Sequence, residues 1–277
     1  MLTEIKAYSS WRSAPILQLD PDGRAEGDLI QIRNITGLDP VKASVSTSPY
    51  GSVDGASYTG SKVLSRNIVL TLKPHPNWDT WTYENLRRLI YSYFMPKLIT
   101  RLVFYSEDML PVEIYGVVED VSINMFSKDP EFLVSIICPD PYFTALNPTI
   151  LTGINGVTNT FDYNGNVESG MIVKVTHVSG APTTINIQLG DPKITNFGVV
   201  ATVTSTKYFE LSSIPMQKYV QNVNVGTGVI DNLLSNVYLQ EGALWPILQP
   251  GENEFKVITD NGVQDYQLIF YERFGGL

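Results

Sequence analysis

The residue types that carry most enzyme chemistry are scarce in this sequence. It contains two histidines, His75 and His177, and a single cysteine, Cys138. His75 lies in the proline-rich run Lys-Pro-His-Pro-Asn, so we expect a solvated loop residue. His177 ends a predicted strand on the same face as Val173 and Val175, so we expect it at the end of a sheet or in the core. With one histidine in each half of the chain, most mechanisms that depend on paired histidines are excluded.

Cys138 closes the apolar run at 132–138. A thiol in such a run is expected to be buried and to pack as a small hydrophobic group. A single cysteine forms no intrachain disulfide. The sequence has no Cys/His metal spacing, no Gly-x-Ser-x-Gly motif and no phosphate-binding glycine loop. We therefore predict no cofactor and no metal.

Two pairs of adjacent carboxylates, at 107–108 and 119–120, are the remaining candidates for acid and base chemistry. A glycosidase needs two carboxyl groups that face each other across a cleft. Glu119 and Asp120 are neighbours on a predicted strand, where successive side chains point to opposite faces. We interpret both pairs as turn and surface charge and predict that the protein is not an enzyme.

The composition indicates a mainly β protein of two domains. The chain has 277 residues, which exceeds the roughly 100–200 residues of one typical domain. Its 15 Tyr and 11 Phe suit pleated strands, and its 21 Gly and 17 Pro suit tight turns between them. The net charge of −9 argues against tight binding to nucleic acid, which requires a surplus of Lys and Arg.

The sequence shows no secretion signal at its start and no apolar stretch of the length that crosses a membrane. We expect synthesis in a cytoplasm and no membrane partner.

The elements of the first half must therefore position interfaces and not a catalytic centre. Alternating or continuous apolar runs predict strands at 29–35, 67–72, 99–105, 112–125 and 132–138. One helix is predicted from Thr80 to Phe94, with Asp79 as its cap and Met95-Pro96 as its stop. Its apolar stripe recurs at i, i+3, i+4 and i+7 and consists of Leu86, Leu89, Ile90 and Tyr93.

Residues 44–62 are small and polar and are predicted to form a long protruding loop, with a hairpin-turn signal at Asp54-Gly55. Compact domains seldom carry so long an irregular connection without using it, which favours an interaction arm over a passive loop. The interface residues predicted on this arm are Ser48, Pro49, Tyr50, Asp54, Gly55 and Tyr58.

A proline-rich run at 139–148 marks the predicted domain boundary near residue 145, which gives domains 1–145 and 146–277. The second half shows short alternating strands at 171–177, 184–189, 198–204, 207–211, 218–225, 253–258 and 264–271. About seven strands without a convincing helix predict a two-sheet sandwich.

Several motifs, taken in order, resemble those of siphophage distal tail proteins, a family of baseplate and tail-tip hub ring proteins. The first half carries them at 37–42, 47–49, 54–55, 66–72, 93–96, 115–119 and 138–143. In the second half, the Trp-Pro-Ile-Leu-Gln-Pro-Gly-Glu-Asn run at 245–253 is similar to the family's ending, and so are residues 273–277.

The resemblance implies an N-terminal β-barrel-like domain with one packed α-helix and a C-terminal galectin-like β-sandwich. It implies a homo-oligomer, a hexameric ring at the phage tail tip within the virion, through which DNA passes. The implied partners are the tail tube protein, a tail hub or fibre protein and receptor-binding proteins.

The alternative hypothesis is a carbohydrate-binding module that recognises glycans of the host cell surface. The galectin sugar motif pairs a His-Asn with a downstream Arg and a Trp-x-x-Glu. Here Val178 follows His177, and Pro246 follows Trp245. A galectin-type sugar site is therefore absent, and we expect Trp245 to pack in the core or at an interface.

Overall fold

The computed structural model describes residues 2–9, 17–19, 29–77, 79, 81–123, 127, 129–190, 195–239 and 245–277. The protein is mainly β, as predicted, and its described residues contain one α-helix. It divides into two compact units, one of residues 1–146 and 274–277, the other of residues 147–273. The sequence had placed residues 274–277 in the second domain, whereas the chain returns to the first unit for its last four residues.

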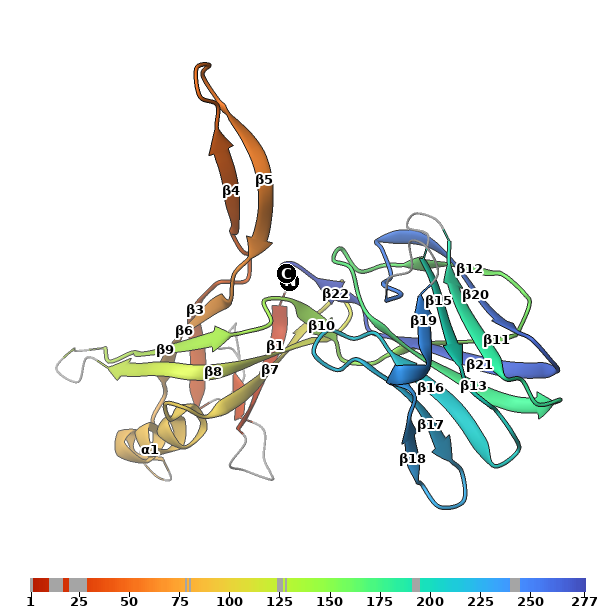
Figure 1. Ribbon diagram of the computed structural model, residues 1–277. Coiled ribbons are helices and arrows are strands. Elements are labelled where there is room, and N and C mark those ends of the chain that lie inside the picture. Colours follow the sequence, from red (N-terminus) through yellow and green to blue (C-terminus); the bar gives the residue numbers. More distant parts are fainter. Residues whose placement is uncertain are drawn as a thin grey trace. The chain divides into compact units, whose positions relative to one another are not determined.

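The first unit is built on one curled antiparallel sheet (Figure 1). Its strands follow the order β2-β1-β7-β8-β9-β6-β3, and β10 pairs with both β8 and β22. Strands β2 and β3 lie near each other at the ends of the path without forming a ladder, so the barrel stays open. The strand bounds are β1 Leu2–Ser9, β2 Leu17–Leu19, β3 Ile30–Thr36, β6 Arg66–Pro74, β7 Ile99–Ser106, β8 Val112–Ile123, β9 Phe132–Cys138, β10 Phe143–Ala145 and β22 Arg273–Phe274.

The apolar positions predicted from alternation form the core of this unit. In β6 and β9 every second side chain is buried and faces the inside of the curl. The end of the predicted strand at 124–125 lies outside the described residues. Strand β1 was not predicted, because only its second half alternates between buried and partly buried side chains.

Helix α1 (Tyr83–Phe94) packs against the inside of the sheet, near β1, β6 and β8. Leu86, Ile90 and Tyr93 are buried as the predicted stripe requires, and Leu89 is partly buried.

The predicted start of this helix is wrong. The N-cap is Thr82, whose Oγ1 accepts a hydrogen bond from the Asn85 amide at 3.3 Å. Asp79 instead sits in a preceding turn, where its amide donates to Asn77 Oδ1 at 3.2 Å. Thr80 lies outside the described residues. Asp and Thr are both favoured N-cap residues, so residue type alone did not distinguish Asp79 from Thr82.

The long connection predicted at 44–62 is also wrong in its local structure. It is a two-stranded antiparallel sheet of β4 (Ala43–Pro49) and β5 (Ala56–Val63), separate from the main sheet. We call residues 43–63 the arm. Neither face of the arm is buried, so its residues need not alternate between apolar and polar. The strands therefore lack the sequence pattern by which strands are recognised.

The second unit is a β-sandwich, as predicted. One sheet has the order β11-β21-β13-β16-β17-β18 and the other β12-β20-β14-β15-β19, and side chains of both sheets form one core. The bounds are β11 Thr149–Ile154, β12 Asn159–Tyr163, β13 Met171–Ser179, β14 Thr184–Leu189, β15 Thr195–Val200, β16 Lys207–Ser212, β17 Tyr219–Asn224, β18 Ile230–Asn232, β19 Val237–Leu239, β20 Gly251–Thr259 and β21 Val263–Phe270. A 3-10 turn, Leu234–Asn236, precedes β19.

The strands of the sandwich that sequence patterns missed lie at the edges of its sheets. Strands β11 and β12, and likewise β18 and β19, each pair with a single neighbour. Edge strands bury less of their surface, so their apolar alternation is weak. The strand predicted at 198–204 begins earlier, at Thr195, and ends at Val200.

Candidate interaction surface

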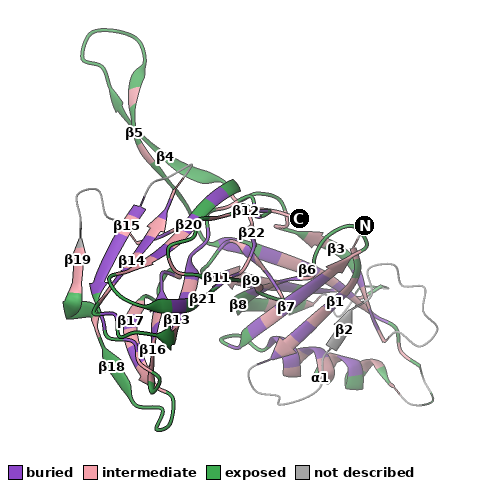
Figure 2. Ribbon diagram, turned by 90° about the vertical axis from the view of Figure 1, so that its right-hand side faces the viewer, coloured by how far each residue is buried: buried purple, intermediate pink, exposed green. Residues whose placement is uncertain are grey.

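The arm is a β-hairpin with almost no buried surface. Figure 2 shows the arm as mostly exposed: every side chain of β4 is exposed, and only Ser57 and Gly60 of β5 are partly buried. The strands pair from Ala43 with Val63 to Pro49 with Ala56, with one extra residue in β5 between the pairs Ser46–Gly60 and Thr47–Tyr58. An isolated two-stranded hairpin is at best marginally stable in water. The arm therefore has little within its own unit to stabilise it.

The predicted interface residues gather at the outer half of this hairpin. Ser48 and Pro49 end β4, and Ser57 Oγ donates to the Ser48 carbonyl at 3.4 Å. The Tyr50 amide donates to the Gly55 carbonyl at 3.4 Å, which closes the tip. The predicted turn residues Asp54 and Gly55 lie in that tip, and Tyr58 lies on β5.

The backbone conformation at the tip of the arm favours glycine. Gly55 has a φ of 111°, which side-chain-bearing residues rarely adopt. The Asp-Gly signal in the sequence therefore located the turn correctly, although the strands on either side of it were missed.

Apolar side chains are spread along the arm without cover. Tyr58 is 66% exposed, Val53 is 70% exposed and Val45 is 59% exposed, and Tyr50 is also exposed. The valines were missed by sequence reasoning. Each valine is an isolated apolar residue in an otherwise polar segment. A search for buried apolar patterns does not select such residues.

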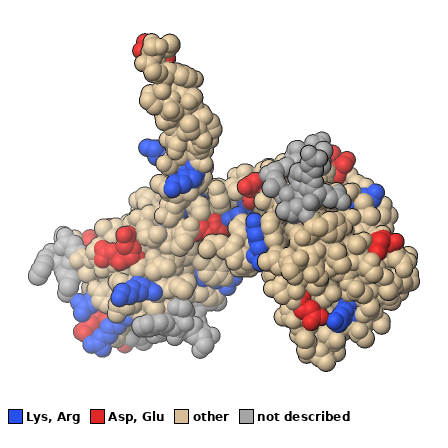
Figure 3. Space-filling view, viewed as in Figure 1, with Lys and Arg blue, Asp and Glu red and all other residues tan. Residues whose placement is uncertain are grey.

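The arm is also almost free of charge. Residues 43–63 contain one acidic residue, Asp54, and one basic residue, Lys62, although the whole chain carries −9. Figure 3 shows a mostly uncharged arm surface in that view. Natural edge strands usually carry charges, prolines or bulges that discourage pairing with other strands. Besides the bulge in β5, the arm has only Pro49, Asp54 and Lys62 as guards of this kind.

Two residues fix the base of the arm to the curled sheet. Gly37, just after β3, has a φ of +88°, and a Cβ there would lie 2.0 Å from the Asn67 carbonyl oxygen of β6. Arg66 begins β6, directly after the arm, and is 2% exposed. The chain segments that enter and leave the arm are therefore held against each other.

The Arg66 guanidinium binds several backbone carbonyls at the base of the arm, and we call this set of contacts the Arg66 anchor. It donates to the carbonyls of Gly37, of Asp39 at 2.8 Å, of Pro141 at 2.6 Å and of Gly275. Its Cζ lies 4.5 Å from the centre of the Phe143 ring, a cation–π contact. Burial lowers the pKa of Arg66 from its ordinary value, because the charged form loses water. A planar group with five N–H donors suits such a cluster of carbonyls.

The two histidines belong to different units. His75 Nε2 is 3.1 Å from Gln31 Oε1 in the first unit, and His177 Nε2 is 2.6 Å from the Gly180 carbonyl in the second. Cys138 is fully buried, and its burial raises the pKa of the thiol to about 12, so it stays protonated at neutral pH.

The carboxylate pair at 119–120 does not show the expected arrangement, in which the two side chains point to opposite faces of a strand. A bulge in β8 interrupts the alternation between Val118 and Asp120, so Glu119 and Asp120 are both exposed. The rule of opposite faces therefore fails at this point. Glu119 Oε2 accepts a hydrogen bond from Ser135 Oγ at 2.8 Å. Among the residues described, no three His, Cys, Asp or Glu side chains gather as a metal site would require.

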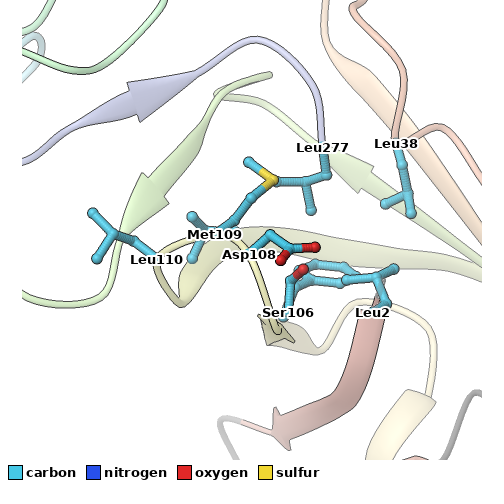
Figure 4. A pocket seen from close by; sticks show the side chains of 9 residues that line it. Leu2, Leu38, Ser106, Asp108, Met109, Leu110 and Leu277 are labelled. Carbon is cyan, nitrogen blue, oxygen red and sulfur yellow. The ribbon is translucent and has the colours of Figure 1, made fainter.

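An apolar cavity of about 260 Å³ lies in the first unit (Figure 4). The amide of Leu277, which borders it, donates to the Leu38 carbonyl at 3.1 Å. A small-molecule site needs a few polar groups that orient the ligand. Ser106 and Asp108 are the polar residues of a lining that otherwise consists of Leu2, Leu38, Phe104, Met109, Leu110, Val112 and Leu277.

Trp245 packs in the second unit, as expected. Its ring centre lies 5.0 Å from that of Phe197, at the margin of the sandwich core. In the part of the chain that the structure describes, no helix is both long and apolar enough to cross a membrane.

Comparison with known proteins identifies the fold. No family model and no curated protein matches the sequence. Among solved structures, the chain is similar to the Dit protein of phage SPP1, described as a paradigm of the hub adsorption apparatus in phages that infect Gram-positive bacteria. The TM-score is 0.68 at 14% identity, over 98% of this chain and 99% of that one. This protein thus has a Dit-like fold across both units.

Two baseplate structures of phage P2 are less similar. The structure with Ca matches with a TM-score of 0.48 at 10% identity, over 100% of both chains. The structure with Sr matches with a TM-score of 0.46 at 10% identity, over 96% of this chain and 97% of that one. At these scores neither likeness carries a structural argument.

Proposed function

We propose that this chain is a structural component of the phage tail tip, a distal tail protein. It assembles into a ring that joins the tail tube to the baseplate or fibre hub. The observation that carries this proposal is the exposed arm with almost no charge, fixed to its own unit by the buried Arg66. The Dit-like fold over nearly the whole chain supports it.

In this proposal residues 1–145 form the ring and the arm lies on a neighbouring copy. A heterologous contact, in which one surface binds a different surface of the next copy, closes into a ring when the rotation is right. A hexamer is the proposed closure. Ring formation would cover both free edges of the arm and its exposed tyrosines and valines.

The sandwich, residues 146–277, is proposed to be galectin-like and to dock tail hub, fibre or receptor-binding proteins. The tail tube protein would contact the ring from the other side. The ring opening would let DNA pass without gripping it, because a chain with a net charge of −9 repels a phosphate backbone. The protein would be made in the host cytoplasm and act in the virion. We propose no enzymatic activity.

The test is the oligomeric state, measured by size exclusion with light scattering across a range of concentrations. We expect a hexamer or a concentration-dependent approach to one. The double variant Val53→Asp with Tyr58→Asp should remain folded and shift the population toward the monomer, because charges would be placed on a contact surface.

The matched control is Val229→Asp with Ile230→Asp, at the end of the β17–β18 turn and the start of β18, where both side chains are 58% exposed. This control should assemble like the natural chain. A strict monomer at high concentration that persists with the tail tube protein present would refute the ring. An arm variant that assembles normally would refute the role of the arm.

A further inference from the structure

Three asparagines of the second unit are each followed by glycine, in the pairs Asn155-Gly156, Asn164-Gly165 and Asn261-Gly262. Asparagine is among the thermolabile residues of proteins. A following glycine has no side chain to hinder the approach of its backbone nitrogen to the asparagine side chain, and it allows the backbone to bend. All three pairs therefore have the composition for one reaction, and their surroundings decide which of them reacts.

The reaction is deamidation, and its only co-reactant is water. The backbone nitrogen of the glycine attacks Cγ of the asparagine, and the new C–N bond closes a five-membered imide. The bond from Cγ to Nδ2 breaks, and ammonia leaves with the proton of the glycine amide. Water then opens the imide at either carbonyl, which gives aspartate or isoaspartate. In isoaspartate the main chain runs through the side-chain carbon and is one atom longer.

The attack requires a glycine N–H that is not bound to an acceptor and an asparagine side chain that is free to rotate into line. Asn155 meets neither condition. The Gly156 amide donates to the Val257 carbonyl at 2.7 Å. Asn155 Nδ2 donates to the Gly262 carbonyl at 3.1 Å, and its Oδ1 accepts from the Gln264 amide at 3.0 Å. This pair is held in an unreactive arrangement by hydrogen bonds at all three groups.

Asn164 is restrained more weakly. Its side chain is exposed, and its Nδ2 donates to Glu272 Oε1 at 3.3 Å. Gly165 is buried, and a Cβ there would lie 2.2 Å from the Tyr163 hydroxyl oxygen. That hydroxyl donates to the Val167 carbonyl at 2.8 Å. Movement of the Gly165 nitrogen toward the asparagine would have to displace these contacts.

Asn261 and Gly262 lie in the exposed turn that carries the chain from β20 in one sheet to β21 in the other. Among the residues that the structure describes, neither the Asn261 side chain nor the Gly262 amide makes a hydrogen bond. The neighbouring carboxylate is engaged elsewhere, because Asp260 Oδ1 accepts from the amides of Thr183 and Thr184 at 2.9 and 3.1 Å. Both reacting groups of this pair are therefore unrestrained.

The other side of Gly262 is closely packed. Gly262 has a φ of 76°, and a Cβ there would lie 2.1 Å from the Ser179 carbonyl oxygen. A Cβ at Gly180 would lie 2.6 Å from the Gly262 Cα. The Gly262 carbonyl also accepts the hydrogen bond from Asn155. The turn therefore has little room for an additional main-chain atom.

We propose that Asn261 is a site of spontaneous deamidation, and that its isoaspartate product weakens the end of the sandwich near this turn. Isoaspartate would displace Gly262 from its contacts with Ser179 and Gly180. It would also remove the acceptor of the Asn155 side chain. The inference concerns the chemical lifetime of the sandwich and is independent of the proposed structural role.

The experiment follows the full chain during incubation at mildly alkaline pH, with peptide mapping by mass spectrometry. Replacement of the side-chain NH₂ by OH changes the peptide mass, and an isoaspartyl methyltransferase assay detects isoaspartate. We expect Asn261 to convert first, Asn164 more slowly and Asn155 last. Each hydrogen bond that has to open slows the reaction by roughly tenfold, so Asn155 should react about a hundredfold more slowly than Asn261. In concentrated urea the three sites should convert at similar rates, because the restraints of the fold are gone.

The matched variant is Asn261→Gln, which keeps an amide but would have to close a six-membered ring. Thermal unfolding before and after incubation measures the consequence for the sandwich. The natural chain should lose on the order of 4 °C in unfolding temperature once isoaspartate has formed, and the variant should lose little.

Conversion of Asn155 or Asn164 in the folded chain as fast as that of Asn261 overturns the assignment of the site. Unchanged unfolding of a chain that carries isoaspartate at position 261 overturns the effect on the sandwich. An equal loss of stability in the natural chain and in Asn261→Gln overturns it as well, because the damage would then lie elsewhere.

Discussion

Arg66 shows how one side chain organises a region that local sequence patterns do not connect. It is 2% exposed and binds backbone carbonyls from three separate segments, near residues 37–39, 141 and 275. A buried charge without partners would be strongly destabilising. The contribution of Arg66 to stability therefore depends on all of these acceptors being in place. The arm, the end of β9 and the last residues of the sequence therefore share one anchor.

Replacing this anchor should destabilise the first unit. We expect Arg66→Met to lower the free energy of unfolding by about 3 kcal/mol or more, because several charge-assisted hydrogen bonds are lost and carbonyls are left buried. Arg66→Lys should recover little of the loss, since one ammonium cannot satisfy four dispersed carbonyls. Urea unfolding measures both.

The control for Arg66 is Arg88→Met on the exposed side of α1. Arg88 is paired with Glu84 at 2.9 Å, and exposed pairs of this kind contribute about 0.5 kcal/mol or less. Equal losses from the two arginine variants would contradict the role assigned to Arg66.

Cys138 predicts a pH dependence. In the folded state burial raises the pKa of the thiol to about 12, against an ordinary value of 9.0. Between these values the unfolded chain has lost the proton and the folded chain has kept it. Because the unfolded state then binds fewer protons, stability should fall as pH rises from 9 to 12, by up to about 1.4 kcal/mol per pH unit.

Burial raises the pKa of Tyr163 and Tyr266 as well, so they add to the same trend. The comparison of the natural chain with Cys138→Ala isolates the cysteine. The variant should be less stable at neutral pH but show a shallower decline above pH 9. Parallel pH profiles would show that the thiol titrates alike in both states.

Properties that depend on one residue and its sequence neighbours could be predicted from the sequence. The apolar run around Cys138 predicted its burial, which is confirmed. The sequence indicated no role for Arg66, because its partners are distant in sequence and bind through backbone atoms that carry no residue signature.

At the scale of elements, periodicity was a good guide where one face is buried. Strand β9 was predicted to the residue, and the buried stripe of α1 was correct. Periodicity did not predict strands that have no buried face, because such strands do not require apolar residues at alternate positions. The arm has two solvent faces, so its strands are encoded by backbone pairing and by the Asp54-Gly55 turn instead.

The arm should therefore exchange its amide hydrogens quickly when it has no partner. In the isolated protomer we expect amides of residues 43–63 to exchange far faster than those of β6 and β9. In the assembled ring they should become protected, because an adjacent surface covers them. Hydrogen exchange with mass spectrometry, at concentrations below and above assembly, measures both states. Fast exchange that persists in an assembled oligomer would show that the arm lies outside the contacts.

At the scale of the whole molecule, composition and strand patterns predicted a mainly β chain, and the fold confirms a curled sheet with one helix followed by a sandwich. The return of residues 274–277 to the first unit was not predictable. Two short stretches, β10 and β22, pair across a long sequence separation, and neither is long enough to show a pattern.

The most direct test of the ring is electron microscopy of the assembled chain, alone and with the tail tube protein. We expect closed rings with an open centre, and we expect the Val53→Asp with Tyr58→Asp variant to yield few of them. Particles that remain single protomers or compact dimers without a central opening, under both conditions, would contradict this expectation.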